Sequence, residues 1–125
     1  MTNDEKQLIY LEISNIQYNW IRQVANQYKQ TKRLIMEYCI QYAKMNEESY
    51  LDLWSQVKGS SFNSIRINLN RAKLFLPEDT TNWLHVMRKR TACKSYCKVI
   101  DLCIMYARLN AREFSEFLRQ HFQEK

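Results

Sequence analysis

The chain has 125 residues, 46% hydrophobic and 26% charged, with a formal net charge of +6, as expected of a single basic globular domain over residues 1–125. It contains one glycine, Gly59, and one proline, Pro77, where average usage supplies about nine and about six. Folds built on many tight turns, such as β-sandwiches and barrels, are therefore excluded, and the composition predicts an all-α fold.

The N-terminal segment is polar, and no apolar run approaches the roughly 18 residues that a membrane-spanning helix needs. We therefore expect a soluble, cytoplasmic protein without a membrane partner. Its four cysteines fall in segments with helical patterning, so free thiols in a reducing compartment are expected.

Helical patterning begins near the N-terminus. Thr2 and Glu5 have the spacing of a capping box, which predicts a helix from near residue 3. Apolar residues then recur every three or four positions along residues 9–28, the pattern of a long amphipathic helix. A break is expected near residue 30, with Thr31 capping a second helix that runs to Met45.

The next two predicted helices flank the glycine. Asn46 is interpreted as the N-cap of a helix that ends at Gly59, because glycine readily adopts the left-handed conformation of a helix end. A further helix is expected up to Pro77, with a buried face formed by Phe62, Ile65, Leu69, Ala72 and Leu76. Three more helices are predicted at about residues 81–91, 93–109 and 111–123.

Two parts of the chain resemble each other. Residues 37–46 (EYCIQYAKMN) and residues 101–110 (DLCIMYARLN) share five identical positions at an offset of 64. Upstream, residues 19–21 (NWI) match residues 82–84 (NWL) at an offset of 63. The pattern predicts a compact bundle of about six to seven helices built from two related three-helix halves, 1–59 and 60–125.

The internal match also assigns several residues to the core. Cys39 and Cys103 occupy matching positions, each beside an isoleucine, and Tyr42 matches Tyr106. We expect all four side chains in the core. Trp83, whose counterpart lies on an apolar stripe, is expected there as well.

The excess of positive charge is confined to one stretch. Residues 1–59 and residues 99–125 each carry equal numbers of acidic and basic side chains, whereas residues 60–98 carry eight basic side chains against two acidic ones. Because most protein surfaces intersperse the two signs, this concentration predicts a binding patch for an anionic partner. Its basic members are Arg66, Arg71, Lys73, Arg88, Lys89, Arg90, Lys94 and Lys98.

The sequence offers no recognisable catalytic or metal-binding motif. One glycine cannot form a Gly-rich phosphate loop, and the two histidines, His85 and His121, occur in unrelated contexts. Cys93 and Cys97 are spaced to share one helix face, but a zinc site needs a second pair of ligands. We therefore predict a protein that is not an enzyme and that holds no metal or cofactor.

Two patterns indicate how nucleic acid would be bound. A helix-turn-helix over residues 51–75 would present four polar residues to a major groove, namely Asn63, Arg66, Asn70 and Lys73. An ordinary helix hairpin with a glycine cap explains the same residues. Independently, positions 90, 94 and 98 are spaced four apart, so their basic side chains would line one face of a continuous helix and neutralise phosphates.

The sequence thus predicts a non-enzymatic protein that binds DNA or RNA through the basic surface of residues 60–98. Its expected setting is that of an accessory subunit in a nucleoprotein assembly with other protein subunits. The alternative is an interaction adaptor or inhibitor whose basic patch docks on an acidic protein. Both kinds of partner attract the same charge, so the sequence alone leaves the choice open.

Overall fold

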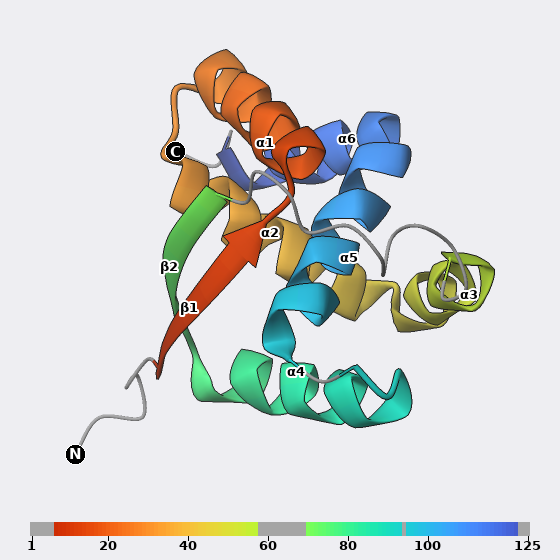
Figure 1. The fold of residues 1–125 in the computed structure, drawn as a ribbon. Helices are drawn as coiled ribbons and strands as arrows, with labels where there is room; N and C mark the ends of the chain where they lie inside the picture. The colour runs from red at the N-terminus through yellow and green to blue at the C-terminus, as the bar shows by residue number, and fades with distance from the viewer. Residues whose placement is uncertain (1–6, 58–69, 94, 123–125) are drawn as a thin grey trace.

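The computed structural model describes residues 7–57, 70–93 and 95–122, and these residues are mostly helical (Figure 1). The predicted all-α bundle is confirmed in part, because the described residues form six helices but also contain two strands. In chain order the elements are β1 (Gln7–Ile13), α1 (Asn15–Tyr28), α2 (Lys32–Met45), α3 (Glu47–Val57), β2 (Asn70–Leu76), α4 (Glu78–Arg90), α5 (Tyr96–Leu109) and α6 (Ala111–Phe122).

The two strands pair with each other as an antiparallel ribbon, with Tyr10 opposite Lys73 at its centre. Two helix predictions are therefore wrong in part, because residues 7–13 and residues 70–76 are strands. Pro77 follows β2 and takes the N-cap position of α4 instead of ending a helix. The expected capping box near the N-terminus and the glycine between the halves lie outside the described residues.

The buried residues of these segments fit either a helix or a strand. Ile9 and Ile13 are both buried and lie four positions apart, a spacing that matches one helical turn and also two steps of strand alternation. In β2 the alternation is clear, because Leu74 and Leu76 are buried while Phe75 between them is 40% exposed. The ribbon joins segments far apart in the chain, so the periodicity within one segment cannot reveal it.

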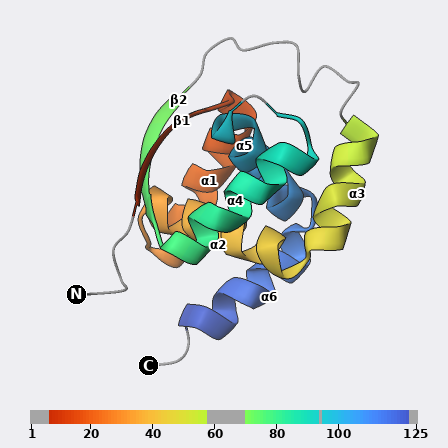
Figure 2. The same ribbon diagram turned by 90° about the horizontal axis from the view of Figure 1, so that it is seen from below.

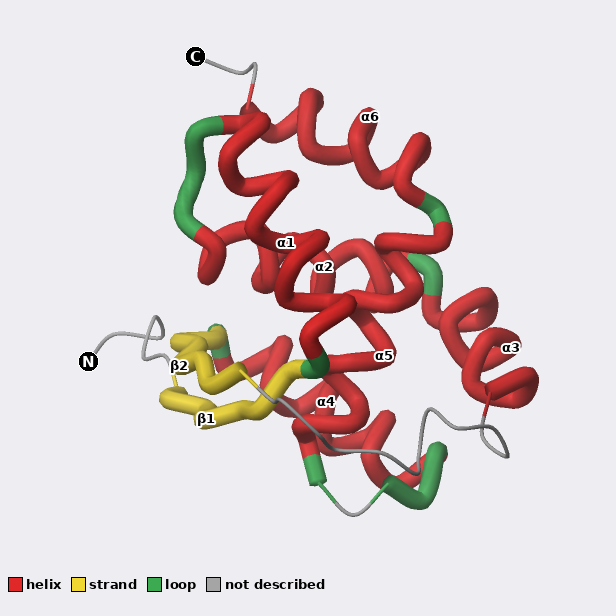
Figure 3. Tube along the Cα trace, turned by 45° about the horizontal axis from the view of Figure 1, so that its top comes forward, coloured by secondary structure: helices red, strands yellow, loops and turns green. Residues whose placement is uncertain are grey.

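The ribbon lies on one side of the helices. Its strand β2 contacts α2, and its strand β1 contacts α5. Figure 2 shows both strands along one side of the bundle with the described helices on their inner face, and Figure 3 shows the strands side by side at the edge of the fold. Because a two-stranded sheet is marginal by itself, its packing on α2 and α5 is what stabilises it.

The order strand, helix, helix, helix occurs twice in the described residues. The starts of β1 and α1 correspond to those of β2 and α4 at an offset of 63, and the starts of α2 and α3 correspond to those of α5 and α6 at an offset of 64. These are the two offsets of the internal sequence match. The starts of β2, α4, α5 and α6 thus follow those of β1, α1, α2 and α3 at these offsets, with one extra position before α5. We refer to the two groups of four elements as the first and the second set.

The two sets of elements interlock, because α2 packs on α5 and the first helix of each set contacts the last helix of the other, α1 with α6 and α4 with α3. The Trp20 ring of α1 lies 5.7 Å from Phe114 of α6. The Trp83 ring of α4 lies 5.5 Å from Tyr50 of α3. Each set therefore completes the core of the other.

The turns that follow α1 and α4 share an unusual backbone conformation. Lys29 and Ala92, which correspond by the same offset as α1 and α4, are the non-glycine residues with positive φ in the described segments, at 57° and 58°. In each turn the next amide donates back to the last turn of the helix, as in a Schellman motif. The break expected near residue 30 is confirmed, and Thr31 caps α2 by accepting a hydrogen bond of 3.1 Å from the Leu34 amide.

Asn46 and Asn110 separate the last two helices of each set. The Asn46 side-chain amide donates to the Tyr42 carbonyl at 2.8 Å, and the Asn110 side-chain amide donates to the Tyr106 carbonyl at 2.9 Å. Each side chain therefore caps the carbonyl end of the helix before it. Asn46 also takes the predicted N-cap position of α3, because it directly precedes Glu47 and its carbonyl accepts a hydrogen bond of 2.9 Å from the Tyr50 amide.

The centre of the bundle is the crossing of α2 and α5. Cys39 and Cys103 are fully buried there, and the rings of Tyr42 and Tyr106 lie 5.5 Å apart. These four core predictions are confirmed, as is that for Trp83, which is 8% exposed. Burial raises the pKa of both cysteine thiols. Burial, with the charge of Tyr106 nearby, raises the pKa of Tyr42 to about 12.

Candidate nucleic-acid interface

The outer face of the ribbon, which is the face turned away from the helices, is built from alternate positions of both strands. In β2 this face carries Lys73 and Phe75, which are exposed, while Leu74 and Leu76 are buried. Directly opposite positions of an antiparallel pair lie on the same face. The register therefore assigns three pairs of positions to the outer face, namely Leu8–Phe75, Tyr10–Lys73 and Glu12–Arg71.

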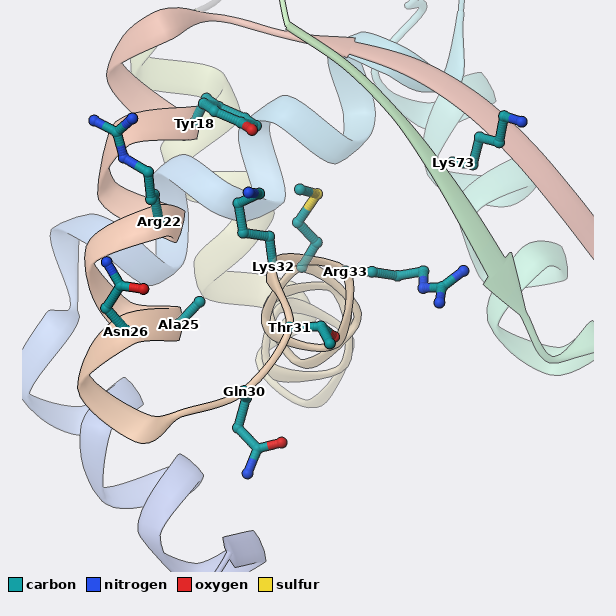
Figure 4. A pocket seen from close by; sticks show the side chains of 10 residues that line it. Tyr18, Arg22, Ala25, Asn26, Gln30, Thr31, Lys32, Arg33 and Lys73 are labelled. Carbon is teal, nitrogen blue, oxygen red and sulfur yellow. The ribbon is translucent and has the colours of Figure 1, made fainter.

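A basic pocket of about 600 Å³ opens beside β2, between α1 and the start of α2 (Figure 4). Its four basic side chains come from three elements: Arg22 from α1, Lys32 and Arg33 from α2, and Lys73 from β2. None of the described residues that line it is acidic. The pocket is therefore strongly positive, and Lys73 joins it to the outer face of the ribbon.

Aromatic rings help to position the cations of the basic pocket. Lys32 Nζ lies 5.5 Å from the centroid of the Tyr18 ring, and the Arg33 guanidinium lies 5.5 Å from that of Phe75. Such contacts hold a basic side chain without neutralising its charge. The first turn of α2 adds backbone N–H groups with partial positive charge, of which Thr31 binds one. Side chains and helix end thus both contribute positive potential to the pocket.

The start of α5 is the counterpart of this region, because α5 contacts β1 as α2 contacts β2. The Arg88 guanidinium lies 5.2 Å from the centroid of the Tyr96 ring, whose hydroxyl lies 3.0 Å from His85 Nδ1. Lys89 is exposed on the same last turn of α4. Basic and aromatic side chains therefore meet at the starts of both helices that support the ribbon.

Two of the residues predicted to bind nucleic acid, Arg71 and Lys73, lie on β2 at positions of the outer face. The predicted helix-turn-helix is wrong for residues 70–75, because they form a strand that pairs with β1. Arg66 and Lys94 lie outside the described residues.

The other predicted residues lie at the junction of α4 and α5. Arg88, Lys89 and Arg90 form the last turn of α4, and Lys98 lies in the first turn of α5. Because α4 ends at Arg90 and α5 begins at Tyr96, the stripe expected along one continuous helix is not formed. The junction brings these residues to a helix end and a helix start instead.

Arg90 already has a contact within the protein. One of its guanidinium nitrogens lies 2.8 Å from Glu47 Oε2 in α3, and Trp83 Nε1 donates to the other oxygen of the same carboxylate at 2.8 Å. The Arg90 side chain is 53% exposed, and surface ion pairs of this kind contribute about 0–1 kcal/mol. Arg90 thus ties α4 to α3, and a phosphate would compete with Glu47 for it.

The cysteine pair considered for metal binding does not lie on one helix. Cys93 precedes α5, whereas Cys97 lies within it. Within the described segments, no group of three His, Cys, Asp or Glu side chains is placed to hold a metal ion. None of the described helices is both long enough and apolar enough to cross a membrane.

Sequence reasoning missed Arg22, Lys32 and Arg33. They belong to residues 1–59, where acidic and basic side chains are equal in number. The fold gathers three of the acidic residues on α3 (Glu47, Glu48 and Asp52), while Arg22, Lys32 and Arg33 line one pocket with Lys73 beside β2. A count along the chain cannot detect a cluster that folding assembles from three elements.

One signal for this cluster was present in the sequence. Lys32 and Arg33 directly follow the cap Thr31, so two cations occupy the first turn of a helix. The helix dipole disfavours positive charge there by about 0.3–1 kcal/mol for each residue. A bound anion would compensate for this cost.

No family model, curated protein or solved structure matches this chain.

Proposed function

We propose that this protein binds double-stranded DNA, with the outer face of the ribbon in the major groove and the flanking basic residues on phosphates. The observation that carries the proposal is the basic pocket, which adjoins the ribbon at Lys73. The major groove of B-DNA is about 12 Å wide and admits a two-stranded ribbon. The sugar–phosphate backbones run along both edges of the groove, where cations beside an inserted ribbon would meet them.

The ribbon favours DNA over RNA as the partner. The major groove of A-form RNA is deep and narrow, so side chains on a ribbon do not reach its base edges. Proteins that bind single strands instead stack bases on exposed aromatic rings. The Phe75 ring, at an outer position of β2, is 40% exposed and is covered on one face by the Arg33 guanidinium.

The basic residues divide into two roles in this proposal. Lys73, which is exposed at an outer position of the ribbon, contacts the bases, and the contact predicted from the sequence for Arg71 of the same strand stays a prediction. The cations of the basic pocket bind phosphates on one flank, and those of the α4–α5 junction bind phosphates on the other. Among the described residues the phosphate-binding set is Arg22, Lys32, Arg33, Arg88, Lys89, Arg90 and Lys98. Arg66 and Lys94, which the sequence also predicts, lie outside the described residues.

We also propose that residues 1–59 and 60–125 arose by duplication of one strand–helix–helix–helix unit. Three observations support this: the repeated element order, the matching positive φ of Lys29 and Ala92, and the matching bonds of Asn46 and Asn110. If each chain held only one such unit, a ribbon of two equivalent strands would need two chains. One duplicated chain would supply both strands and act as a non-enzymatic accessory subunit of a nucleoprotein assembly.

The proposal is tested by fluorescence anisotropy with a labelled DNA duplex. The double substitution Lys32→Ala with Arg33→Ala should weaken binding and reduce the slope of log K against log salt by about 0.9 for each phosphate that the variant no longer neutralises. It removes positive charge from a helix start, so a loss of stability is not expected. Thermal melting checks that the variant is folded.

The matched control is Arg119→Ala, an exposed residue of α6, the helix that packs on α2 and α5. It should leave both the affinity and the salt slope unchanged. The absence of duplex binding at low salt would contradict the proposal, as would a double variant that binds as tightly as the unmodified protein. Binding to an acidic protein without binding to DNA would favour the adaptor alternative.

A further inference from the structure

The basic pocket beside β2 has buried apolar residues as well as exposed cations. Ala25 of α1 and Met36 of α2 line it and are 3% and 2% exposed, whereas Arg22, Lys32 and Lys73 are exposed. We call the two buried residues the floor of the pocket and the cations its rim. The volume of about 600 Å³ lies within the range of about 300–1,000 Å³ that is typical of pockets for small organic ligands. A DNA backbone that crosses the rim would leave the floor uncovered, so there is room for a small molecule.

The cations of the rim are not neutralised by neighbouring acidic side chains. Arg22, Lys32 and Arg33 form no ion pair with a described residue, and no acidic residue is among those described that line the pocket. Figure 4 shows Lys32 near the middle of the pocket, with Arg22 on the α1 side and Lys73 on the β2 side. Like charges held together repel each other, and a bound anion removes that repulsion. The rim therefore favours a ligand with several negative charges.

The donors of the rim suit phosphate groups. Arg22 and Arg33 come from different helices, and a guanidinium group binds two phosphate oxygens at once. The Thr31 hydroxyl accepts a hydrogen bond from the Leu34 amide and keeps its own proton for donation. The N–H groups of the first turn of α2 also attract phosphate. One phosphate monoester carries about two negative charges at most, so four cations match two or more linked phosphates.

The other lining residues suit an organic group attached to the phosphates. Asn26 and Gln30 have side-chain amides, each of which donates and accepts hydrogen bonds. The half-buried Tyr18 ring lies 5.5 Å from Lys32 Nζ and closes the pocket on the α1 side. An apolar floor beside two amides fits a planar heterocycle with donors and acceptors along its edge. A nucleoside has this chemistry.

We infer that the basic pocket binds a small ligand that carries a diphosphate group, with a nucleoside diphosphate as the form that fits both rim and floor. The phosphates lie against Arg22, Lys32 and Arg33, and the nucleoside lies on the floor. The proposed function assigns the same three cations to DNA phosphates. The ligand therefore competes with duplex DNA, a consequence that rests on the proposed function, whereas the site itself does not.

The site is tested by isothermal titration calorimetry of the full-length protein, without DNA, against ADP and against inorganic pyrophosphate at fixed ionic strength. Both probes should bind at one site per chain, and ADP should bind more tightly because pyrophosphate leaves the floor uncovered. Absence of binding by both probes overturns the inference. Equal affinities would overturn the assignment of the nucleoside to the floor.

A pair of variants with equal changes of charge separates the pocket from general attraction to a basic protein. Arg22→Gln with Lys32→Gln should weaken ADP binding by at least about 10-fold, because each removes hydrogen bonds to a charged group. Arg112→Gln with Arg119→Gln removes the same charge from exposed positions of α6 and should leave the affinity unchanged. Equal weakening by the two folded variants would overturn the inference. Thermal melting reports whether each variant is folded.

Competition with a labelled duplex distinguishes failure of the inference from failure of the proposed function. ADP is added to the protein–DNA complex at fixed ionic strength, and fluorescence anisotropy should show release of the duplex. If the duplex stays bound at ADP concentrations that fill the site, the competition is overturned. If no duplex binds at low salt, the proposed function fails, and calorimetry alone decides whether the pocket is a diphosphate site.

Discussion

The four cysteines show how identical side chains acquire different chemistry from their surroundings. Cys39 and Cys103 are fully buried where α2 crosses α5, whereas Cys93 and Cys97 are only half-buried near the start of α5. The thiolate is the reactive form of cysteine, and burial raises the pKa of Cys39 and of Cys103. Burial therefore suppresses both the access of a reagent and the ionisation that it needs.

We expect an aromatic disulfide reagent to modify Cys93 and Cys97 in the native protein and to reach Cys39 and Cys103 only on unfolding. The reaction is followed by absorbance with and without denaturant. Substituting Ser for both Cys93 and Cys97 should abolish the fast phase and leave the slow one. Simultaneous reaction of four thiols in the native protein would show that the crossing of α2 and α5 is open.

At the level of elements, helix ends are set by backbone geometry that the sequence only partly indicates. The turn after α4 places Ala92 at φ 58°, a conformation that costs a residue with a Cβ atom about 1–2 kcal/mol. Glycine adopts this conformation without that cost but loses more entropy on folding. The matching turn after α1 places Lys29 at φ 57°, so the geometry does not depend on one side chain.

Ala92→Gly is accordingly expected to stabilise the protein by up to about 1 kcal/mol, because the relief of backbone strain exceeds the entropic loss. The matched control is Ala111→Gly at the start of α6, where glycine should destabilise by up to about 1 kcal/mol. Both free energies of unfolding are measured by urea denaturation. Equal destabilisation by the two substitutions would contradict the positive φ assigned to Ala92.

At the level of the whole molecule, the two sets of elements are interlocked. β1 pairs with β2, α2 packs on α5, and the Trp20 and Trp83 rings each contact an aromatic ring of the other set. Neither set has a complete hydrophobic core by itself. Stability is therefore a property of the full chain and not of a separable half.

Produced as separate polypeptides, residues 1–59 and 60–125 should each lack stable tertiary structure as monomers, because each exposes the surface that the other covers. Mixing them should restore helical circular dichroism and cooperative melting, with the full chain as the reference. Light scattering reports whether a half has paired with itself. A monomeric half that melts cooperatively would contradict the interlocked arrangement.

The helices and the central core were predictable, because apolar residues recur at helical spacing and the buried residues of α2 and α5 match in type. The ribbon was not, because Ile9 and Ile13 have a spacing that suits a helix as well as a strand. The basic residues of β2 and of the α4–α5 junction were predictable, because they belong to residues 60–98, which carry the excess positive charge. The cations beside Lys73 were not, since they belong to a segment with no net charge.

The sequence by itself determined the mostly helical character, the break near residue 30 and the core residues at the crossing of α2 and α5. These depend on local propensity and on patterns within a few turns of chain. Only the tertiary structure decided that β1 pairs with β2 and that Arg22, Lys32 and Arg33 meet Lys73 at one pocket. Strand pairing and charge clustering between distant segments depend on contacts that no local pattern encodes.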